Sequence, residues 1–245
     1  MKKLLISILC IFVPGRHRRG ALRVQLNYPI RRWTKFAKSF STARYPRAKY
    51  TYGFRCANFV VKIDDKYVFK FPLGDDGYAI ATREKRITDA LRPISPIKIP
   101  KMEIVEFEGV AVRKYECING IGFHALDRKT QNAHVDKIAK QLAKFLYVVG
   151  MVDPREIFDL KDNKNDKPSV MHGWNQNDLW DNFIMDPKTF DVIALIDWED
   201  AGFNDFYKSF VGGTGNDKAK VALLREYLKL YLSESIRKKR VNKRK

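Results

Sequence analysis

Residues 170–203 constrain the fold most, because polar residues alternate there with two short apolar runs. The stretch reads VMHGWNQNDLWDNFIMDPKTFDVIALIDWEDAGF. The runs FIM and VIALI are typical of short strands, and DPKTFD between them is typical of a turn. The polar segment NDLWDN precedes the first strand, and Asp197 ends the second run. A carboxylate just past a buried strand is well placed to enter a cleft.

The residue types in this stretch suit phosphoryl transfer. This reaction needs a carboxylate to orient and deprotonate the acceptor hydroxyl, ligands for magnesium, and a lysine on the nucleotide phosphates. Asp178 would orient the hydroxyl, while Asn182 and Asp197 offer hard oxygen ligands for magnesium. The other interpretation of the stretch is a hairpin with an ordinary polar turn.

The lysine must come from another part of the chain. Lys70 lies in the mostly apolar run YVFKFP, where a charged side chain needs a partner. Glu84, on a predicted helix, would supply that partner. The segment 53–62, GFRCANFVVK, would form a turn over the phosphates, although its glycine content is poor.

Hydrophobic periodicity predicts strands first and mainly helices later. KYTYGFRCANFVVKI and KYVFKFP read as strands around the turn DD, and DGYAIATREKRITDALRP reads as a helix that ends before Pro93. KMEIVEF and GVAVRKYECI form a predicted hairpin around Glu108 and Gly109. NAHVDKIAKQLAKFLYVVG and DKAKVALLREYLKLYLSES are predicted helices, and DLKDNKNDKPS is a predicted loop.

Together these segments resemble a known family. HG, DLWDNFIMD and IALIDWEDAGF match, in order, the segments H-G-D-L-x-x-x-N-I-L-x-D and I-D-W-E-x-A of the aminoglycoside phosphotransferase and choline kinase group of protein-kinase-like enzymes. CANFVVKI and VFKFP look like the family's first three strands, TREKRI like its Glu-bearing helix and VRKYECINGI like its hinge. GFNDF looks like the Gly-x-x-Asp piece that follows in such kinases.

The resemblance implies an α+β, bilobal protein-kinase-like fold, with a small antiparallel-sheet N-lobe that carries one helix and a mostly helical C-lobe. It implies ATP and Mg²⁺ as cofactors. Lys70 would hold the nucleotide phosphates and Glu84 would hold Lys70. The backbone at Tyr115, Glu116 and Cys117 would bind adenine.

By the same resemblance, Asp178 is the catalytic carboxylate, and Asn182 and Asp197 bind magnesium. In the family the catalytic Asp lies two residues after the His and five before the Asn. Here WNQN follows HG, and Asn177 takes the five-before position. An amide cannot accept the proton, which argues against Asn177, and Asp181 is a poorer candidate because it is adjacent to Asn182. We therefore assign the role to Asp178. An inactive kinase fold is the alternative.

Structural roles are the simpler interpretation of several neighbouring residues. His172 is expected to stabilise the loop, and Glu199 and Asp200 are expected to be solvated acids at a helix start. The tryptophans of this region are expected in the core or in a cleft wall, and they are Trp174, Trp180 and Trp198.

The net charge of +19 is concentrated at the two ends of the chain. Residues 1–50 hold thirteen Lys or Arg and no acid, and the C-terminal IRKKRVNKRK holds seven more. Cationic ends suit an anionic surface, such as membrane lipid, nucleic acid or a phosphorylated glycan. The apolar run from Leu4 to Val13 is too short to span a bilayer. With the arginines that follow it, this run favours an interfacial anchor over an export signal or a core helix.

Residues 23–49 interleave basic and aromatic side chains without a sustained period. Such a segment binds single-stranded nucleic acid, lies over a membrane or covers a neighbouring sheet, and we favour the last two. The cysteines Cys10, Cys56 and Cys117 are widely spaced, which indicates buried thiols in a reducing compartment.

The sequence therefore predicts a membrane-associating segment at 1–49, an N-lobe at 50–120, a C-lobe at 121–235 and a basic tail at 236–245. The predicted function is ATP-dependent phosphorylation of a hydroxyl on a membrane-held glycolipid, such as a lipopolysaccharide core sugar. A weak resemblance of the N-terminus to bacterial envelope-glycan enzymes favours this acceptor. A small-molecule kinase of the choline or aminoglycoside type is the second choice, followed by a protein kinase and an inactive binding module. The predicted location is cytoplasmic, peripheral on the inner face of the bacterial inner membrane.

Overall fold

The computed structural model describes residues 8, 11–13, 30–55, 58–73, 76–158, 169–211 and 213–242. The chain divides into two compact units. Unit 1 comprises residues 1–83 and 102–117, and unit 2 comprises residues 84–101 and 118–245. Most of the predicted N-terminal anchor, the centre of the 53–62 turn, the loop at 159–168 and the end of the basic tail lie outside the described residues.

Unit 1 is built on a five-stranded antiparallel sheet in the order β1-β2-β3-β5-β4. Two of its turns have the left-handed backbone that tight hairpins need. Asp64 and Asp65 have φ of 49° and 52°, and Glu108 and Gly109 have φ of 48° and 76°. Both turns were predicted from the sequence and are confirmed. The strands are β1 (Tyr50–Arg55), β2 (Asn58–Ile63), β3 (Tyr67–Pro72), β4 (Met102–Phe107) and β5 (Val110–Glu116).

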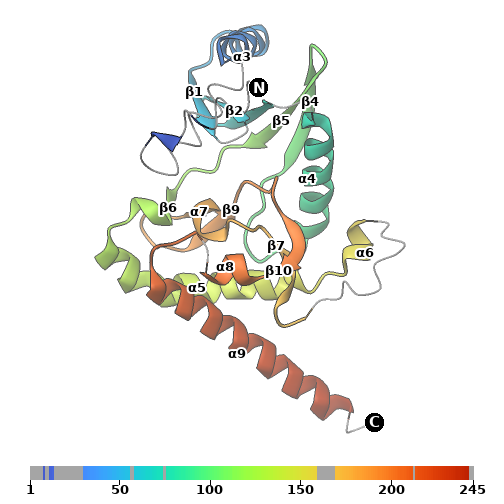
Figure 1. The fold of residues 1–245 in the computed structure, drawn as a ribbon, viewed down its shortest axis with the longest axis vertical. Coiled ribbons are helices and arrows are strands. Elements are labelled where there is room, and N and C mark those ends of the chain that lie inside the picture. The colour runs from blue at the N-terminus through green and yellow to red at the C-terminus, as the bar shows by residue number, and fades with distance from the viewer. Residues whose placement is uncertain are drawn as a thin grey trace. The chain divides into compact units, whose positions relative to one another are not determined.

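The helix α3 (Ile30–Arg44) lies against one face of this sheet (Figure 1). Phe40 is fully buried, and its ring meets those of Phe69 and Phe71 edge to face. Residues 30–44 therefore have a helical period, and the prediction that this segment lacks one is wrong there. Covering a neighbouring sheet was one of the roles considered for the segment, and α3 has this role.

The helix α4 (Gly77–Leu91) begins in unit 1 and ends in unit 2. It was predicted as a helix that ends before Pro93, and this is confirmed. Leu91 and Ile87 are fully buried and belong to the apolar core of unit 2.

Unit 2 is mainly helical. Its two long helices, α5 (Arg128–Gly150) and α9 (Asp217–Asn242), pack side by side (Figure 1). The predicted apolar face of α5 is confirmed, because Val135, Ile138, Leu142 and Phe145 are all buried. The shorter helices are η1 (Phe123–Ala125), α6 (Pro154–Ile157), α7 (Leu179–Asn182) and α8 (Tyr207–Val211).

Two small sheets complete unit 2. β7 (His172–Asn175) pairs with β10 (Gly202–Asp205), and the two strands run antiparallel to each other. β8 (Phe183–Met185) lies between β6 (Ile121–Gly122) and β9 (Val192–Leu195). The predicted strands FIM and VIALI correspond to β8 and β9. The predicted α+β fold, with an antiparallel sheet followed by a helical region, is confirmed.

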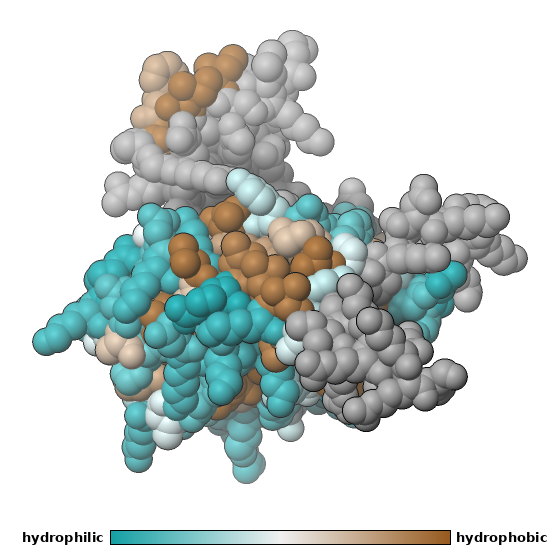
Figure 2. Space-filling model, turned by 90° about the horizontal axis from the view of Figure 1, so that it is seen from below, coloured by the Kyte–Doolittle hydropathy of each residue, from teal (hydrophilic) through white to brown (hydrophobic). Residues whose placement is uncertain are grey.

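The surface is mostly hydrophilic on the face drawn in Figure 2, with a group of hydrophobic side chains near its centre. Exposed apolar residues of α8 and α9 are Tyr207, Val211, Val221 and Leu232. Within the described ranges, none of the helices has both the length and the apolar character needed to cross a membrane.

Candidate active site

The strand β7 carries the chain into the candidate site. Gly173 in this strand has no room for a side chain, because a Cβ there would lie 2.3 Å from the carbonyl oxygen of Gly150. The strand continues through Trp174 and Asn175, which pair with β10. The four residues WNQN are therefore not an insertion into the loop, since half of them belong to the strand and the loop begins at Gln176.

Gln176 connects the two segments that carry the predicted carboxylates. Its side chain is almost fully buried, with a relative exposure of 1%. The Oε1 atom accepts a hydrogen bond from the backbone N–H of Asp178 at 2.9 Å. The Nε2 atom donates to the carbonyl oxygen of Ile196 at 3.2 Å and to that of Asp197. One buried amide therefore fixes the backbone at both Asp178 and Asp197.

Two asparagines fix the turn between β7 and α7. The backbone N–H of Asn177 donates to Oδ1 of Asn175 at 2.7 Å, and the side-chain amide of Asn177 donates to the carbonyl oxygen of Asp200 at 2.5 Å. Asn177 has a φ of 72°, a conformation that asparagine adopts more readily than most residues. Asn175 is fully buried and also accepts from the hydroxyl of Ser209 at 3.4 Å. The amide of Asn177 therefore holds the loop 196–201.

Asp178 follows as the residue directly before α7. It is exposed, and its side chain does not cap the helix. Asn182 ends α7, and its carbonyl oxygen accepts a hydrogen bond from the backbone N–H of Ile196 at 2.9 Å. Asp197 is the next residue, half-buried, with a φ of 63°. Left-handed backbone at a residue other than glycine is concentrated at functional sites. Asp178 and Asn182 thus lie at the two ends of α7, and hydrogen bonds join this segment to the one that carries Asp197.

The donor chemistry at Asn182 and Asp197 fits a magnesium ion. Magnesium in nucleotide-dependent enzymes is bound through one or two carboxylates together with the substrate phosphates. Asp197 supplies a carboxylate and Asn182 an amide oxygen. In the part of the chain that the structure describes, no group of three or more His, Cys, Asp or Glu residues is arranged to hold a metal.

Several other residues of the stretch 170–203 contact side chains of unit 2. His172 lies in β7 with its ring 4.9 Å from that of Phe203, and it is not in the loop with Asp178. A carboxylate oxygen of Asp181 lies 2.7 Å from Nε2 of His124. Three tryptophans are at most 2% exposed in the core of unit 2, as predicted, and they are Trp174, Trp180 and Trp198.

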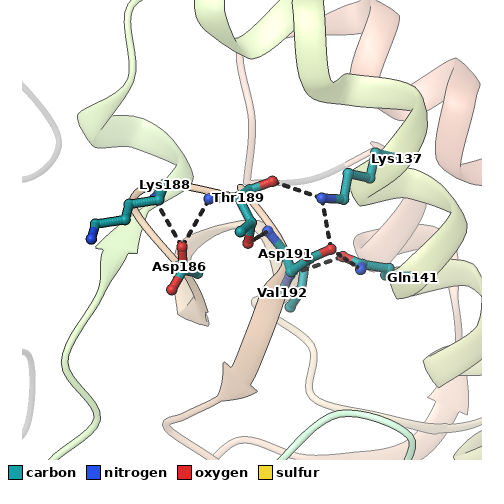
Figure 3. A network of polar contacts seen from close by, with 7 residues as sticks. All are labelled: Lys137, Gln141, Asp186, Lys188, Thr189, Asp191 and Val192. Atoms are coloured by element: carbon teal, nitrogen blue, oxygen red, sulfur yellow. Dashed lines mark hydrogen bonds and ion pairs between the residues drawn. The ribbon is translucent and has the colours of Figure 1, made fainter.

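The hairpin of β8 and β9 is tied to α5 by a network of polar contacts (Figure 3). Lys137 forms an ion pair with Asp191 at 2.8 Å and donates to the carbonyl oxygen of Thr189. Gln141 donates to Asp191 at 2.7 Å and accepts from the backbone N–H of Val192 at 2.8 Å. Lys137, Thr189 and Gln141 together lower the pKa of Asp191 to about 2. This network holds the strand that leads to Asp197.

Lys70 lies on the face of the sheet opposite α3, because its neighbours in β3, Phe69 and Phe71, contact Phe40 of that helix. Lys70 is half-buried in β3, with its ammonium group 5.5 Å from the ring centre of Tyr115. Arg113 of β5 is directly opposite Lys70 and is buried, with a hydrogen bond to Asn58. Antiparallel partners share one face of a sheet, so two cationic side chains lie next to each other. Arg113 was not among the residues predicted from the sequence, because its burial depends on the strand pairing.

The predicted hinge ends β5. Tyr67 pairs with Glu116, and the backbone N–H of Cys117 donates to the carbonyl oxygen of Lys66 at 2.7 Å. That N–H of Cys117 therefore has a partner within the protein. Glu84 lies in unit 2, on α4, and is fully buried. Its pairing with Lys70 remains a prediction.

Comparison with known proteins shows the fold. No family model matches the chain, and no curated protein matches it. Solved structures do match. The GDP complex of a mutant aminoglycoside 2′-phosphotransferase IIIa has a TM-score of 0.61 at 14% identity, over 78% of this chain and 80% of that one.

Two further structures are similar over most of their length. The macrolide 2′-phosphotransferase of Brachybacterium faecium has a TM-score of 0.54 at 13% identity, over 79% of this chain and 82% of that one. An aminoglycoside 3′-phosphotransferase of type VIII has a TM-score of 0.53 at 18% identity, over 79% of this chain and 90% of that one. This chain therefore has the protein-kinase-like fold of the aminoglycoside and macrolide phosphotransferases.

Proposed function

We propose that this protein is a kinase that transfers a phosphoryl group from MgATP to a hydroxyl group, and that the acceptor is a sugar of a membrane-held glycolipid. One observation carries the proposal for kinase activity. The side chain of Gln176 forms hydrogen bonds with the backbone of Asp178 and with that of Asp197. The carbonyl oxygen of Asn182 accepts a hydrogen bond from the backbone N–H of Ile196. The residues proposed as general base and as magnesium ligands therefore belong to one hydrogen-bonded loop system, which supports the proposal.

Asp178 is the proposed general base. It is exposed and lies directly before α7, and unlike Asn177 it carries a carboxylate that can accept a proton. Asp178 would orient the acceptor hydroxyl and take its proton as the acceptor oxygen forms a bond to the γ-phosphorus. The bond from that phosphorus to the bridging oxygen breaks, and ADP leaves with the electron pair.

Asn182 and Asp197 would hold magnesium, which neutralises charge on the transferring phosphate. Lys70 would contact the phosphates, and Glu84 would orient Lys70. The hinge at Tyr115, Glu116 and Cys117 would accommodate the adenine. Among the solved structures of this fold, one is a ternary complex with streptomycin and ATP, which supports a nucleotide as the phosphoryl donor.

The charge distribution supports a glycolipid acceptor. Choline and aminoglycosides are cations, and cationic ligands are bound by acidic residues and aromatic cages. The first 63 residues of this chain contain no Asp or Glu, and the last ten contain seven Lys or Arg. Basic ends of this kind suit an anionic, membrane-held acceptor and a location on the inner face of the cytoplasmic membrane. A lipopolysaccharide core sugar has this character.

A small-molecule acceptor is the second candidate. The specific observation in its favour is the fold, since several structures of this fold are named for phosphorylating aminoglycosides or macrolides. A phosphate-transfer screen would compare lipopolysaccharide core, an aminoglycoside, a macrolide and choline. We expect transfer to the core glycan; transfer only to a soluble small molecule would replace the first candidate with the second.

The kinase proposal is tested by comparing Asp178→Asn with Asp181→Asn. Both changes replace an exposed carboxylate of the same segment by its amide. We expect Asp178→Asn to lower kcat by about 10² to 10⁴, the usual contribution of a general base. Asp181→Asn should retain most of the activity. Equal activities of the two variants, measured as ADP release with an accepted substrate, would refute the role of Asp178.

A further inference from the structure

We propose that the exposed face of α3 is a docking surface for the anionic headgroups of a phospholipid bilayer. The surface, here called the basic face, consists of Arg32, Lys35 and Lys38. All three side chains are exposed. Lys35 lies on the side of the helix opposite the buried residues Ala37 and Phe40, and Arg32 and Lys38 flank that side.

The basic face lies in a part of the sequence that contains no acidic residue. The chain has no acidic residue before Asp64. At the C-terminal end of α3, the side chain of Arg44 donates to the backbone carbonyl oxygen of Glu106 at 3.4 Å. Arg32, Lys35 and Lys38 form no ion pair with a described carboxylate. Their charges are therefore available to an external anion.

The packing of α3 decides which anion fits. Binding of single-stranded nucleic acid relies on aromatic rings that stack on the bases. In α3 the aromatic rings turn toward the sheet and toward one another: Phe36 meets Trp33 and Phe71 edge to face, and Phe40 is fully buried. The basic face thus offers charge without stacking rings, which is the chemistry of attraction to an anionic membrane surface.

The same packing excludes insertion of α3 into the bilayer. An interfacial helix buries its apolar face among the acyl chains. The apolar face of α3 is already covered by the sheet, so this helix would contact headgroups only. The apolar run earlier in the chain offers a separate contact, and Ile11 and Phe12 within it are 65% and 80% exposed. Binding through the basic face should therefore be electrostatic and weakened by salt.

The test measures sedimentation of the full chain with vesicles of phosphatidylcholine, with and without phosphatidylglycerol, in the absence of ATP. The variant is Arg32→Gln/Lys35→Gln/Lys38→Gln. The matched control is Lys129→Gln/Lys140→Gln/Lys144→Gln, which removes three exposed lysines from α5 and changes the net charge equally. Each basic residue near an anionic surface is expected to strengthen binding about fivefold.

We expect the α3 variant to lose roughly a hundredfold in affinity for anionic vesicles, and the α5 control to lose much less. The charge-preserving variant Lys35→Arg/Lys38→Arg should bind like the wild type, which separates charge from folding. Equal losses in the α3 and α5 variants would overturn the proposal, since net charge alone would then explain binding. Unchanged binding of the α3 variant would also overturn it.

Nucleic acid is examined in the same experiment. Oligothymidine is added as a competitor. If it displaces the protein from anionic vesicles, and if its own binding to the protein requires Arg32, Lys35 and Lys38, the basic face is a nucleic-acid surface and the lipid proposal fails. The inference rests on the proposed peripheral location but not on catalysis. Vesicle binding requires no phosphoryl transfer, so the kinase proposal and the docking proposal can fail separately.

Discussion

At the scale of single residues, a neutral amide organises the loop that carries the proposed catalytic carboxylate. Gln176 is buried and uses its oxygen for Asp178 and its nitrogen for the carbonyls of Ile196 and Asp197. A buried polar group that loses its partner costs about 1–3 kcal/mol in stability. A change at this position should therefore affect both the stability of the protein and the position of the carboxylates.

We predict that Gln176→Glu impairs catalysis more than it impairs folding. The carboxylate keeps an acceptor for the N–H of Asp178 but loses the N–H groups that bind the two carbonyls. The loop at Asp197 should shift, so the apparent affinity for magnesium and kcat should both fall. Steady-state kinetics at varied magnesium, together with thermal unfolding, measures the two effects.

Gln141→Glu serves as the control for this prediction. Gln141 also bridges a carboxylate and a backbone N–H, but in the network of α5 with the β8–β9 hairpin. The change should lower the melting temperature and leave the magnesium dependence close to that of the wild type. If both variants showed the same magnesium dependence, Gln176 would have only a structural role.

The residues His172 and Gly173 match the family motif in sequence but not in position. The pair HG matches the family pattern, yet His172 and Gly173 lie in a strand, and Gly173 is required by its close approach to Gly150. The loop residue two positions before Asp178 is Gln176, which occupies the position that the family pattern gives to histidine. This could be recognised only after the pairing of β7 with β10 was known.

At the scale of elements, the β8–β9 hairpin depends on an ion pair with a neighbouring helix. Lys137, Thr189 and Gln141 stabilise the ionised form of Asp191 and lower its pKa from 3.8 to about 2. The turn itself is closed by Asp186, whose carboxylate accepts from the backbone N–H groups of Thr189 and Lys188, both at 2.8 Å. Those two bonds lower the pKa of Asp186 as well.

We predict that Asp191→Asn lowers the melting temperature at neutral pH but not in strong acid. The folded pKa lies below the unfolded value, so the contribution of Asp191 to stability is complete above about pH 4 and is lost as the pH falls toward 2. Thermal unfolding of wild type and variant across this range tests the prediction.

A double-mutant cycle assigns the effect to the ion pair. Lys137→Gln should destabilise the protein at neutral pH, and the double variant Lys137→Gln/Asp191→Asn should be less destabilised than the sum of the single changes. Additive effects, or a difference between wild type and Asp191→Asn that persists at pH 2, would contradict this account.

The strands of unit 1 and the helices α4, α5 and α9 were predictable, whereas α3 and the short helices were not. The strands and turns of unit 1 follow from alternation and from the DD and Glu-Gly turn residues, because these signals are local. The apolar face of α3 is short, and basic residues are interspersed with the aromatic ones in its sequence. This helix is stabilised by packing against the sheet that it covers, and the sheet is formed by residues later in the chain.

At the scale of the whole molecule, the proposed function predicts that nucleotide and magnesium stabilise the fold together. A ligand present at 100 times its Kd stabilises a protein by about 2.7 kcal/mol. For a chain of this length, this corresponds to a rise of roughly 5–10 °C in the melting temperature. Thermal unfolding with ATP, with magnesium and with both measures this rise.

Asp197→Asn is the variant that separates metal binding from folding. Asparagine tolerates the left-handed backbone at this position, where φ is 63°, so the melting temperature without ligand should be nearly unchanged. The additional rise caused by magnesium in the presence of ATP should disappear. A normal magnesium effect in Asp197→Asn would remove this residue from the proposed metal site.

The sequence by itself determined the strands of unit 1, the helices α4, α5 and α9, the α+β class and the candidate residues Lys70, Asp178, Asn182 and Asp197. Periodicity, turn residues and motif order are properties of short segments, so they can be recognised without a structure. The tertiary structure decided that Gln176 bridges two loops, that Arg113 lies beside Lys70 and that α3 covers the sheet with its apolar face. These features depend on pairing between residues far apart in the chain, because burial and hydrogen-bond partners are set only when those segments meet.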